Sequence, residues 1–289
     1  MSNITIVTNT YQKYHRQNVA WESWVHLKKT FPEHTDLFNI QFQDEGKTFT
    51  DYYDYMTTSF WLDQSSQTLE PNSIKKLPVL YDIIDAGFQL TDSEYVLYTN
   101  SDVILLPRLI ECILKEEPDC MAGPRMDIEH IESFQDVLDE KVVPVRVEIA
   151  GYDYFVFKRS WWELNKSYFN HAFVIGKPVF DVDYAGLMVL LGGNYIIAND
   201  YPMMALHIHH GIDAVTTDCP EKTWNESVHN NNPLLRIANN VMFYNLQYNL
   251  CKRTPWGVFI KQQPNEQSIQ KDFFDSMNIH HVNHIKYPS

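Results

Sequence analysis

Four short stretches of the sequence contain acidic, amide or imidazole side chains that could carry chemistry, and two of them, the first and the last, could bind a metal ion. They are Asn100-Ser101-Asp102, Gly151-Tyr152-Asp153, Asp181-Val182-Asp183 and His207-Ile208-His209-His210. The first follows an apolar run over residues 95–98 and is followed at once by another. A carboxylate at the end of such a strand can coordinate Mg²⁺ or Mn²⁺, hard cations that also bind diphosphate oxygens. The same residue types form Asx-turns at strand ends, so local sequence alone leaves both interpretations open.

The histidine stretch is the second candidate for metal binding, because three histidines occur within four positions at the end of a predicted strand. If the strand continues through them, His207 and His209 share one face and His210 points away. A pure zinc site is the alternative, but the stretch has no nearby cysteine and no H-E-x-x-H pattern.

The elements that would position these stretches alternate between strand and helix patterns. Residues 3–11 and 36–42 read as strands on either side of a helix over 17–31, which is the unit of a parallel sheet. A helix with Ser73 as a possible N-cap and Gly87 as a possible end leads into the strand before Asn100. Further helices are predicted over 107–118 and 182–191, while residues 43–72 show no clean period. We expect one α/β domain over residues 1–211 and a C-terminal extension, 212–289, that packs on it and is weakly helical from 233 to 250.

Composition narrows the possible partners. The 289 residues carry 23 Lys plus Arg against 37 Asp plus Glu, a net charge of −14, which disfavours nucleic acid and anionic membranes as partners. Four cysteines lie far apart and are expected to be reduced thiols. No signal peptide or membrane-spanning run is recognised, so the expected location is the cytoplasm.

The order of these motifs resembles the nucleotide-diphospho-sugar glycosyltransferases of the GT-A fold over residues 3–211. In that family a D-x-D motif follows a central strand and its last Asp binds the metal that carries the sugar nucleotide; here Asn100 replaces the first Asp. The "ALHIHH" stretch is similar to an "AIHQNH" segment of bacterial relatives, which pairs His207 and His210 with the two family histidines. The resemblance therefore implies a three-layer α/β/α domain with a mostly parallel central sheet, and a Mn²⁺ or Mg²⁺ site at Asp102, His207 and His210.

The resemblance also implies roles for acidic residues on the acceptor side. "GYDYFVF" is similar to a family segment there, and Asp153 could accept hydrogen bonds from sugar hydroxyls; Trp161 and Trp162 are expected in the core. An acidic residue at the start of a helix serves as general base or acceptor ligand in this family, and must then lie within about 3 Å of the attacking oxygen. Asp183 is the first candidate and Asp181 the alternative, although Asp181 also suits an N-cap and Asp183 the positive end of the helix dipole.

The donor is expected to contact residues at the strand ends and before the helix that precedes Asn100. The nucleotide-sugar contacts implied are Thr8, Asn9, Tyr11, Lys75, Lys76, Asn100, Ser101 and Asp102. The predicted activity is metal-dependent transfer of a sugar from a nucleoside diphosphate to a saccharide or lipid-linked acceptor. Two alternatives remain: a nucleotidyltransferase that makes the activated sugar, although the first strand is not followed by a Gly-rich loop, and a catalytically silent binding domain of the same fold.

Overall fold

The structure is a computed structural model that describes residues 3–10, 14–45, 55–148, 151–197, 204–210, 219–247, 251–253 and 259–261. Its largest element is a nine-stranded sheet in the order β12-β13-β10-β6-β9-β4-β1-β2-β3. These strands are β1 (Ile4–Thr8), β2 (Thr35–Phe42), β3 (Thr57–Leu62), β4 (Tyr95–Thr99), β6 (Cys120–Gly123), β9 (Tyr154–Lys158), β10 (Tyr195–Ile197), β12 (Cys251–Arg253) and β13 (Phe259–Lys261).

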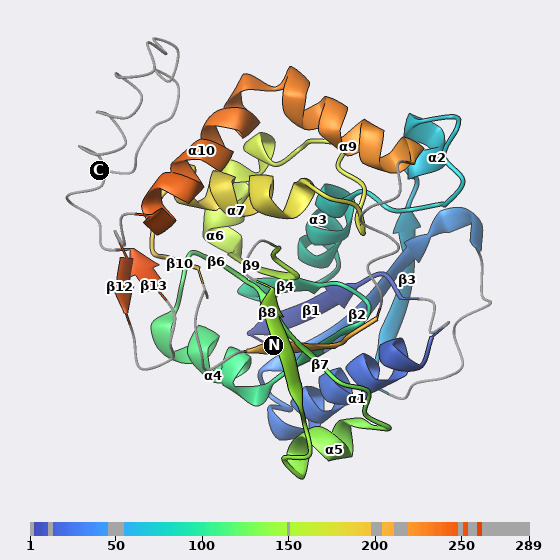
Figure 1. Cartoon of the computed structure of the whole chain (residues 1–289), viewed down its shortest axis with the longest axis vertical. Coiled ribbons are helices and arrows are strands. Elements are labelled where there is room, and N and C mark those ends of the chain that lie inside the picture. Colours follow the sequence, from blue (N-terminus) through green and yellow to red (C-terminus); the bar gives the residue numbers. More distant parts are fainter. Residues whose placement is uncertain are drawn as a thin grey trace.

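Most strands of this sheet run in one direction. The pairs β1–β2, β1–β4, β2–β3 and β6–β10 are parallel, and only β9 and β13 run against their neighbours. Helices cover both faces, as Figure 1 shows. The predicted three-layer α/β/α class with a mostly parallel central sheet is therefore confirmed.

One face of the sheet is covered by α1 (His15–Thr30) and α4 (Pro107–Glu116), which bury residues such as Trp24, Leu27 and Ile110. The other face is covered by α3 (Leu80–Leu90), α6 (Arg159–Asn165) and α7 (Phe180–Leu191), and α10 (Pro233–Gln247) packs on α7. The other helical elements are the short α2 (Ser66–Leu69), α5 (Phe134–Leu138) and η2 (Lys166–Tyr168), and the longer α9 (Pro220–Asn231). Both expected core tryptophans are buried, Trp161 at 7% and Trp162 at 0% exposure.

A second, four-stranded sheet joins the α1 and α4 side in the order β5-β11-β7-β8. Its strands are β5 (Val103–Leu105), β7 (Arg125–Ile128), β8 (Pro144–Glu148) and β11 (Ala205–Ile208). β5 follows β4 after a turn of three residues, so the chain passes from one sheet to the other at Asn100-Ser101-Asp102. The predicted motif thus lies at the junction of the two sheets.

The helix before β4 differs from its prediction at both ends. α3 begins at Leu80, and Ser73 instead donates its hydroxyl to Glu221 of α9 over 2.6 Å. Gly87 lies inside α3 rather than at its end, and a Cβ there would lie 2.8 Å from Val7 of β1. Glycine therefore lets this helix approach the sheet closely.

The segment with no clean period, 43–72, contains β3 and α2 among its described residues. After residue 211, the described chain forms the helices α9 and α10 and adds β12 and β13 to the large sheet. The boundary at 211 stays a prediction. No helix among the described residues is both long and apolar enough to cross a membrane, and Cys112, Cys120 and Cys219 are free thiols.

Candidate metal and donor site

Strand register brings the two predicted metal-binding stretches together. β11 pairs antiparallel with β5, and His207 lies opposite Val103, the residue after Asp102. The chain leaves the strand after Ile208, so the alternation that would turn His210 away does not extend to it. His210 Nε2 lies 3.1 Å from His207 Nε2, and the two nitrogens lie 3.7 and 3.5 Å from Asp102 Oδ2.

Asp102, His207 and His210 therefore form a cluster in which one donor atom from each lies within 4.8 Å of the others. A carboxylate with two imidazoles is a donor set that suits Mn²⁺, Zn²⁺ and similar divalent cations. The third histidine, His209, lies near a different carboxylate, with its Nδ1 3.5 Å from Asp127 Oδ2. This donor set fits the divalent cation that the sequence implies. The two histidines in it are His207 and His210, not the pair His207 and His209 that strand alternation indicated.

His207 is held in its orientation by a buried carboxylate. β7 pairs with β11 so that Asp127 lies beside His207, and Asp127 Oδ1 lies 2.9 Å from His207 Nδ1. Histidines that bind metals usually donate their second ring nitrogen to such a partner, which fixes the tautomer that leaves Nε2 free. Burial lowers the pKa of His207, but Asp102 and Asp127 outweigh it and raise the pKa above its usual value.

The start of α1 also contacts the cluster. Arg16 Nε donates to Asp102 Oδ2 over 2.9 Å, and Gln17 Nε2 donates to Ser101 Oγ over 2.9 Å. Burial alone would raise the pKa of Asp102, but hydrogen bonds from His207, His210 and Arg16 hold the pKa well below its usual value. Asp102 is thus a carboxylate at neutral pH, and the guanidinium of Arg16 places a positive charge beside it.

The side chain of Asn100 forms hydrogen bonds with Asp153 and Tyr98 rather than with Asp102. Its Nδ2 donates to Asp153 Oδ1 over 2.7 Å, and its Oδ1 accepts the Tyr98 hydroxyl over 2.7 Å. The first position of the motif is therefore a neutral link between two strands. An amide can donate to the carboxylate of Asp153, whereas a second carboxylate would repel it.

Arg125 connects Asp153 to the carboxylate behind His207. Its Nη1 lies 2.5 Å from Asp153 Oδ2 and its Nε 3.0 Å from Asp127 Oδ1. Burial disfavours the charge, but the two carboxylates raise the pKa of Arg125, so the guanidinium stays protonated. Asp153 is 5% exposed and each of its oxygens has a partner within the chain.

The two candidate bases lie in different environments, although both belong to the first turn of α7. Asp183 is fully buried and accepts hydrogen bonds from His229 Nδ1 at 2.8 Å and Asn239 Nδ2 at 3.2 Å. It links α7 to α9 and α10, and this placement does not favour it as a base. The helix begins at Phe180, so Asp181 is not the N-cap that its position indicated.

Asp181 instead reaches the segment just before β9, which carries Asp153. Its Oδ2 accepts the backbone N–H of Tyr152 over 3.1 Å, and the side chain is only partly buried. Burial and, secondarily, the charge of Asp153 raise the pKa of Asp181 to about 7. A carboxyl with this pKa can exchange a proton near neutral pH, which is the requirement for a general base.

The residues predicted to contact the nucleotide differ in their burial and in their hydrogen-bond partners. Thr8 ends β1 with a buried hydroxyl that has no hydrogen-bond partner among the described residues, whereas Asn9 donates to the backbone oxygen of Ile40 over 2.7 Å and so joins β1 to β2. Lys75 is exposed, and Lys76 is paired with Asp44 at 2.5 Å. Tyr11 lies outside the described residues.

Four residues of this site were not predicted: Arg16, Gln17, Arg125 and Asp127. The available signal was Arg125 and Asp127 at alternate positions of a short strand, which places them on one face. Arg16 and Gln17 gave no such signal, because a polar helix start is ordinary.

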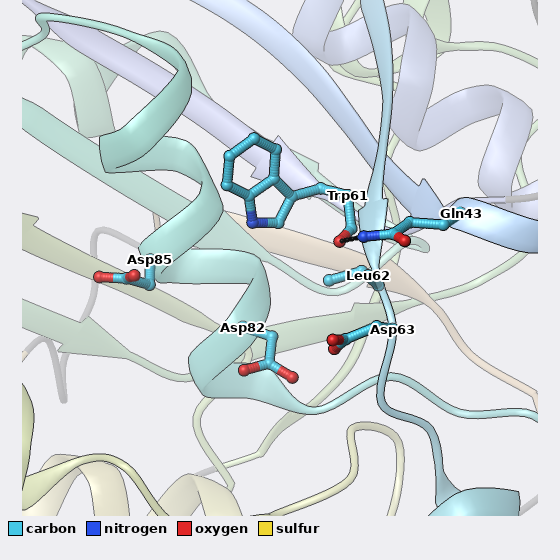
Figure 2. A pocket seen from close by; sticks show the side chains of 6 residues that line it. All are labelled: Gln43, Trp61, Leu62, Asp63, Asp82 and Asp85. Atoms are coloured by element: carbon cyan, nitrogen blue, oxygen red, sulfur yellow. Dashed lines mark hydrogen bonds between the residues drawn. The ribbon is translucent and has the colours of Figure 1, made fainter.

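A separate cavity of about 290 Å³ opens between β3 and α3, lined by Gln43, Trp61, Leu62, Asp63, Asp82 and Asp85 (Figure 2). The carboxylates of Asp63 and Asp82 face each other there, and one oxygen of Asp82 is buried without a hydrogen-bond partner (Figure 2). Burial, followed by the charges of Asp63 and Asp85, raises the pKa of Asp82 to about 6.

No known protein family and no curated protein matches the sequence. Among solved structures, a mutant of the Drosophila β-1,4-galactosyltransferase 7 in complex with manganese, UDP-Gal and xylobiose is similar over 79% of this chain and 79% of its own, with 10% identity and a TM-score of 0.45. S. aureus TarS is similar over 72% of this chain and 60% of its own, with 10% identity and a TM-score of 0.42. A glycosyltransferase involved in the glycosylation of the major capsid of PBCV-1 is similar over 72% and 95%, with 10% identity and a TM-score of 0.37. The present chain thus spans less than two thirds of the TarS chain, and likenesses this weak do not decide its function.

Proposed function

We propose that the chain is a glycosyltransferase that moves a sugar from a nucleoside diphosphate to an acceptor hydroxyl on a saccharide or lipid-linked glycan, with a divalent cation. The observation that carries the proposal is the convergence of Asp102, His207 and His210 at the end of a central strand, with Asp127 holding His207 from behind. In open α/β sheets, ligands bind outside the carboxyl ends of the strands, which is where this cluster lies.

Asp102, His207 and His210 would hold the cation, and of the two expected ions this donor set favours Mn²⁺, because Mg²⁺ prefers oxygen ligands. When bound, such a cation neutralises charge on the diphosphate leaving group as a Lewis acid. Arg16, already bonded to Asp102, supports the same task because its guanidinium can pair with phosphate oxygens.

The remaining acidic residues would serve the acceptor side. Asp153 immediately precedes β9 and lies beside the motif, since its backbone oxygen accepts the N–H of Asn100 over 3.1 Å. Asp181, with its pKa raised to about 7 and its carboxylate bonded to Tyr152 beside Asp153, would take the proton of an acceptor hydroxyl. We therefore propose Asp181 as the general base if the reaction inverts the anomeric centre, and Asp153 as the group that orients hydroxyls beside it.

The test is calorimetry of UDP, GDP, CDP and dTDP with and without Mn²⁺, on the wild-type protein and on Asp102→Ala. Binding of one nucleotide that needs both Mn²⁺ and Asp102 is expected. Asp92→Asn is the matched control, because Asp92 is exposed near the opposite end of β4. If no nucleotide binds, or if Asp102→Ala binds as well as the control, the proposed site is wrong.

Hydrolysis of a panel of sugar nucleotides then separates an enzyme from a silent domain. A transferase releases the nucleoside diphosphate slowly without an acceptor, and Asp181→Asn should reduce this release without weakening nucleotide binding. A domain that only binds would retain the Mn²⁺-dependent affinity but show no release in any variant. A nucleotidyltransferase would instead release pyrophosphate from a nucleoside triphosphate.

A further inference from the structure

A second group of metal-binding side chains lies on the surface beside the first turn of α1. It consists of His15, His130 and Glu132, each of which offers one donor atom within 4.8 Å of the others. All three side chains are exposed, and none takes part in the donor site described above. The group joins the start of a helix to the connection between β7 and α5.

Contacts within the group already hold the side chains together. His15 Nε2 lies 2.9 Å from the backbone oxygen of Ile131, and the rings of His15 and His130 have centroids 5.0 Å apart. His130 Nε2 lies 3.3 Å from Glu132 Oε1. An imidazole has two ring nitrogens, and a metal-bound histidine commonly donates the second one to a backbone carbonyl.

The donor set identifies the class of ion. Two imidazoles and one carboxylate suit a divalent transition metal such as Zn²⁺, whereas Ca²⁺ and Mg²⁺ prefer oxygen ligands alone. Three protein ligands at an exposed position leave coordination positions for water.

We propose that His15, His130 and Glu132 form a second cation site, of the Zn²⁺ class, independent of the cluster at Asp102. Bound there, the cation would fix the first turn of α1 to the segment before α5. That turn carries Arg16 and Gln17, which bond to Asp102 and Ser101, so the second site would stabilise the element that positions the donor-site contacts.

The experiment is equilibrium dialysis of the full chain against Zn²⁺ alone, with His130→Gln and His210→Gln as reciprocal variants. The comparison between variants is needed because the chain has 12 histidines, so the wild-type stoichiometry alone does not identify a site. His130→Gln should lose one equivalent of bound Zn²⁺ and keep the equivalent that depends on His210; His210→Gln should show the opposite. Loss of a ligand should weaken the affected site by more than the roughly 10–100-fold that loss of an outer partner costs.

Stability measurements provide a second readout. Zn²⁺ should raise the unfolding temperature of His210→Gln, in which the cluster at Asp102 has lost a ligand, and this rise should disappear in the double variant with His130→Gln. Glu132→Gln repeats the test at an exposed side chain that is not an imidazole. If both His130→Gln and Glu132→Gln bind as much Zn²⁺ as the wild type, the second site does not exist, and the proposal for Asp102 is unaffected.

Discussion

Replacing Asn100 by aspartate should destabilise this protein. Asn100 donates to Asp153 Oδ1 over 2.7 Å, so Asn100→Asp places two carboxylates against each other at a position where Asp153 is 5% exposed. Two unit charges about 4 Å apart interact with about 4 kcal/mol at an effective dielectric constant of about 20. Arg125, which lies 2.5 Å from the other oxygen of Asp153, offsets part of this repulsion. We expect Asn100→Asp to lower the free energy of unfolding by roughly 2–4 kcal/mol at pH 7.5.

A double-mutant cycle isolates the repulsion from other effects of the two changes. In Asn100→Asp combined with Asp153→Asn, one amide again faces one carboxylate, so the double variant should be more stable than the sum of the single variants predicts. The assay is urea denaturation followed by tryptophan fluorescence, with the exposed Asn170→Asp as control for the chemical change alone. A recovery of about 2 kcal/mol or more is expected.

Two results would refute the reasoning. If the effects of the two substitutions add within about 0.5 kcal/mol, Asn100 and Asp153 do not interact as the structure shows. If Asn100→Asp instead strengthens Mn²⁺-dependent nucleotide binding, the first position contributes to the metal site rather than to the link with Asp153.

Three further outcomes follow from the same structure. Asp127→Asn should weaken Mn²⁺ binding about 10–100-fold, because the carboxylate that orients His207 is lost; calorimetry measures this, and an unchanged affinity in a folded variant would contradict it. Donor hydrolysis or transfer should rise with pH through about 7 as Asp181 loses its proton, and Asp181→Asn should flatten this limb; a limb that persists in the variant assigns it to another group. Asp82 has a pKa raised to about 6 in the folded protein, so its ionisation lowers the free energy of unfolding as pH rises from about 4 to 6. Asp82→Asn should therefore raise the free energy of unfolding by roughly 1–2 kcal/mol at pH 7.5 and by little at pH 4. Thermal denaturation at the two pH values measures this difference.

The regular parts of the fold were predictable because their apolar patterns are local. β1, α1, β2 and α4 lie close to their predicted ranges, and each buries a face that the sequence marks with Val, Ile, Leu or Trp. β3 was missed because it is an edge strand whose residues are mostly partly or fully exposed, so no alternation of apolar side chains marks it. The predicted start of α3 was wrong for a different reason. Ser73 is not the N-cap of this helix, and its hydroxyl instead donates to Glu221, 148 residues away along the chain.

The two aspartates of α7 show where local reasoning about a site reaches its limit. Helix dipole and capping arguments treat Asp181 and Asp183 as near equivalents, because both belong to the first turn. Their difference arises from α9 and α10, which supply His229 and Asn239 to Asp183 and bury it. Since α9 was not predicted and α10 gave only a weak pattern in the sequence, the contacts that separate the two aspartates could not be anticipated.

The cluster at Asp102 depends on the register of a sheet whose strands have only three to five residues. β11 places His207 opposite Val103 on one side and Asp127 on the other, and these partners lie 104 and 80 residues away along the chain. Successive side chains of a strand point to opposite faces, so a slip of one residue would turn His207 away from both carboxylates. Leu206 and Ile208 are both buried, 3% and 5% exposed, and a slip would move them from their apolar surroundings into the polar cluster. Burial of Leu206 and Ile208 therefore fixes the position of His207 between Asp102 and Asp127.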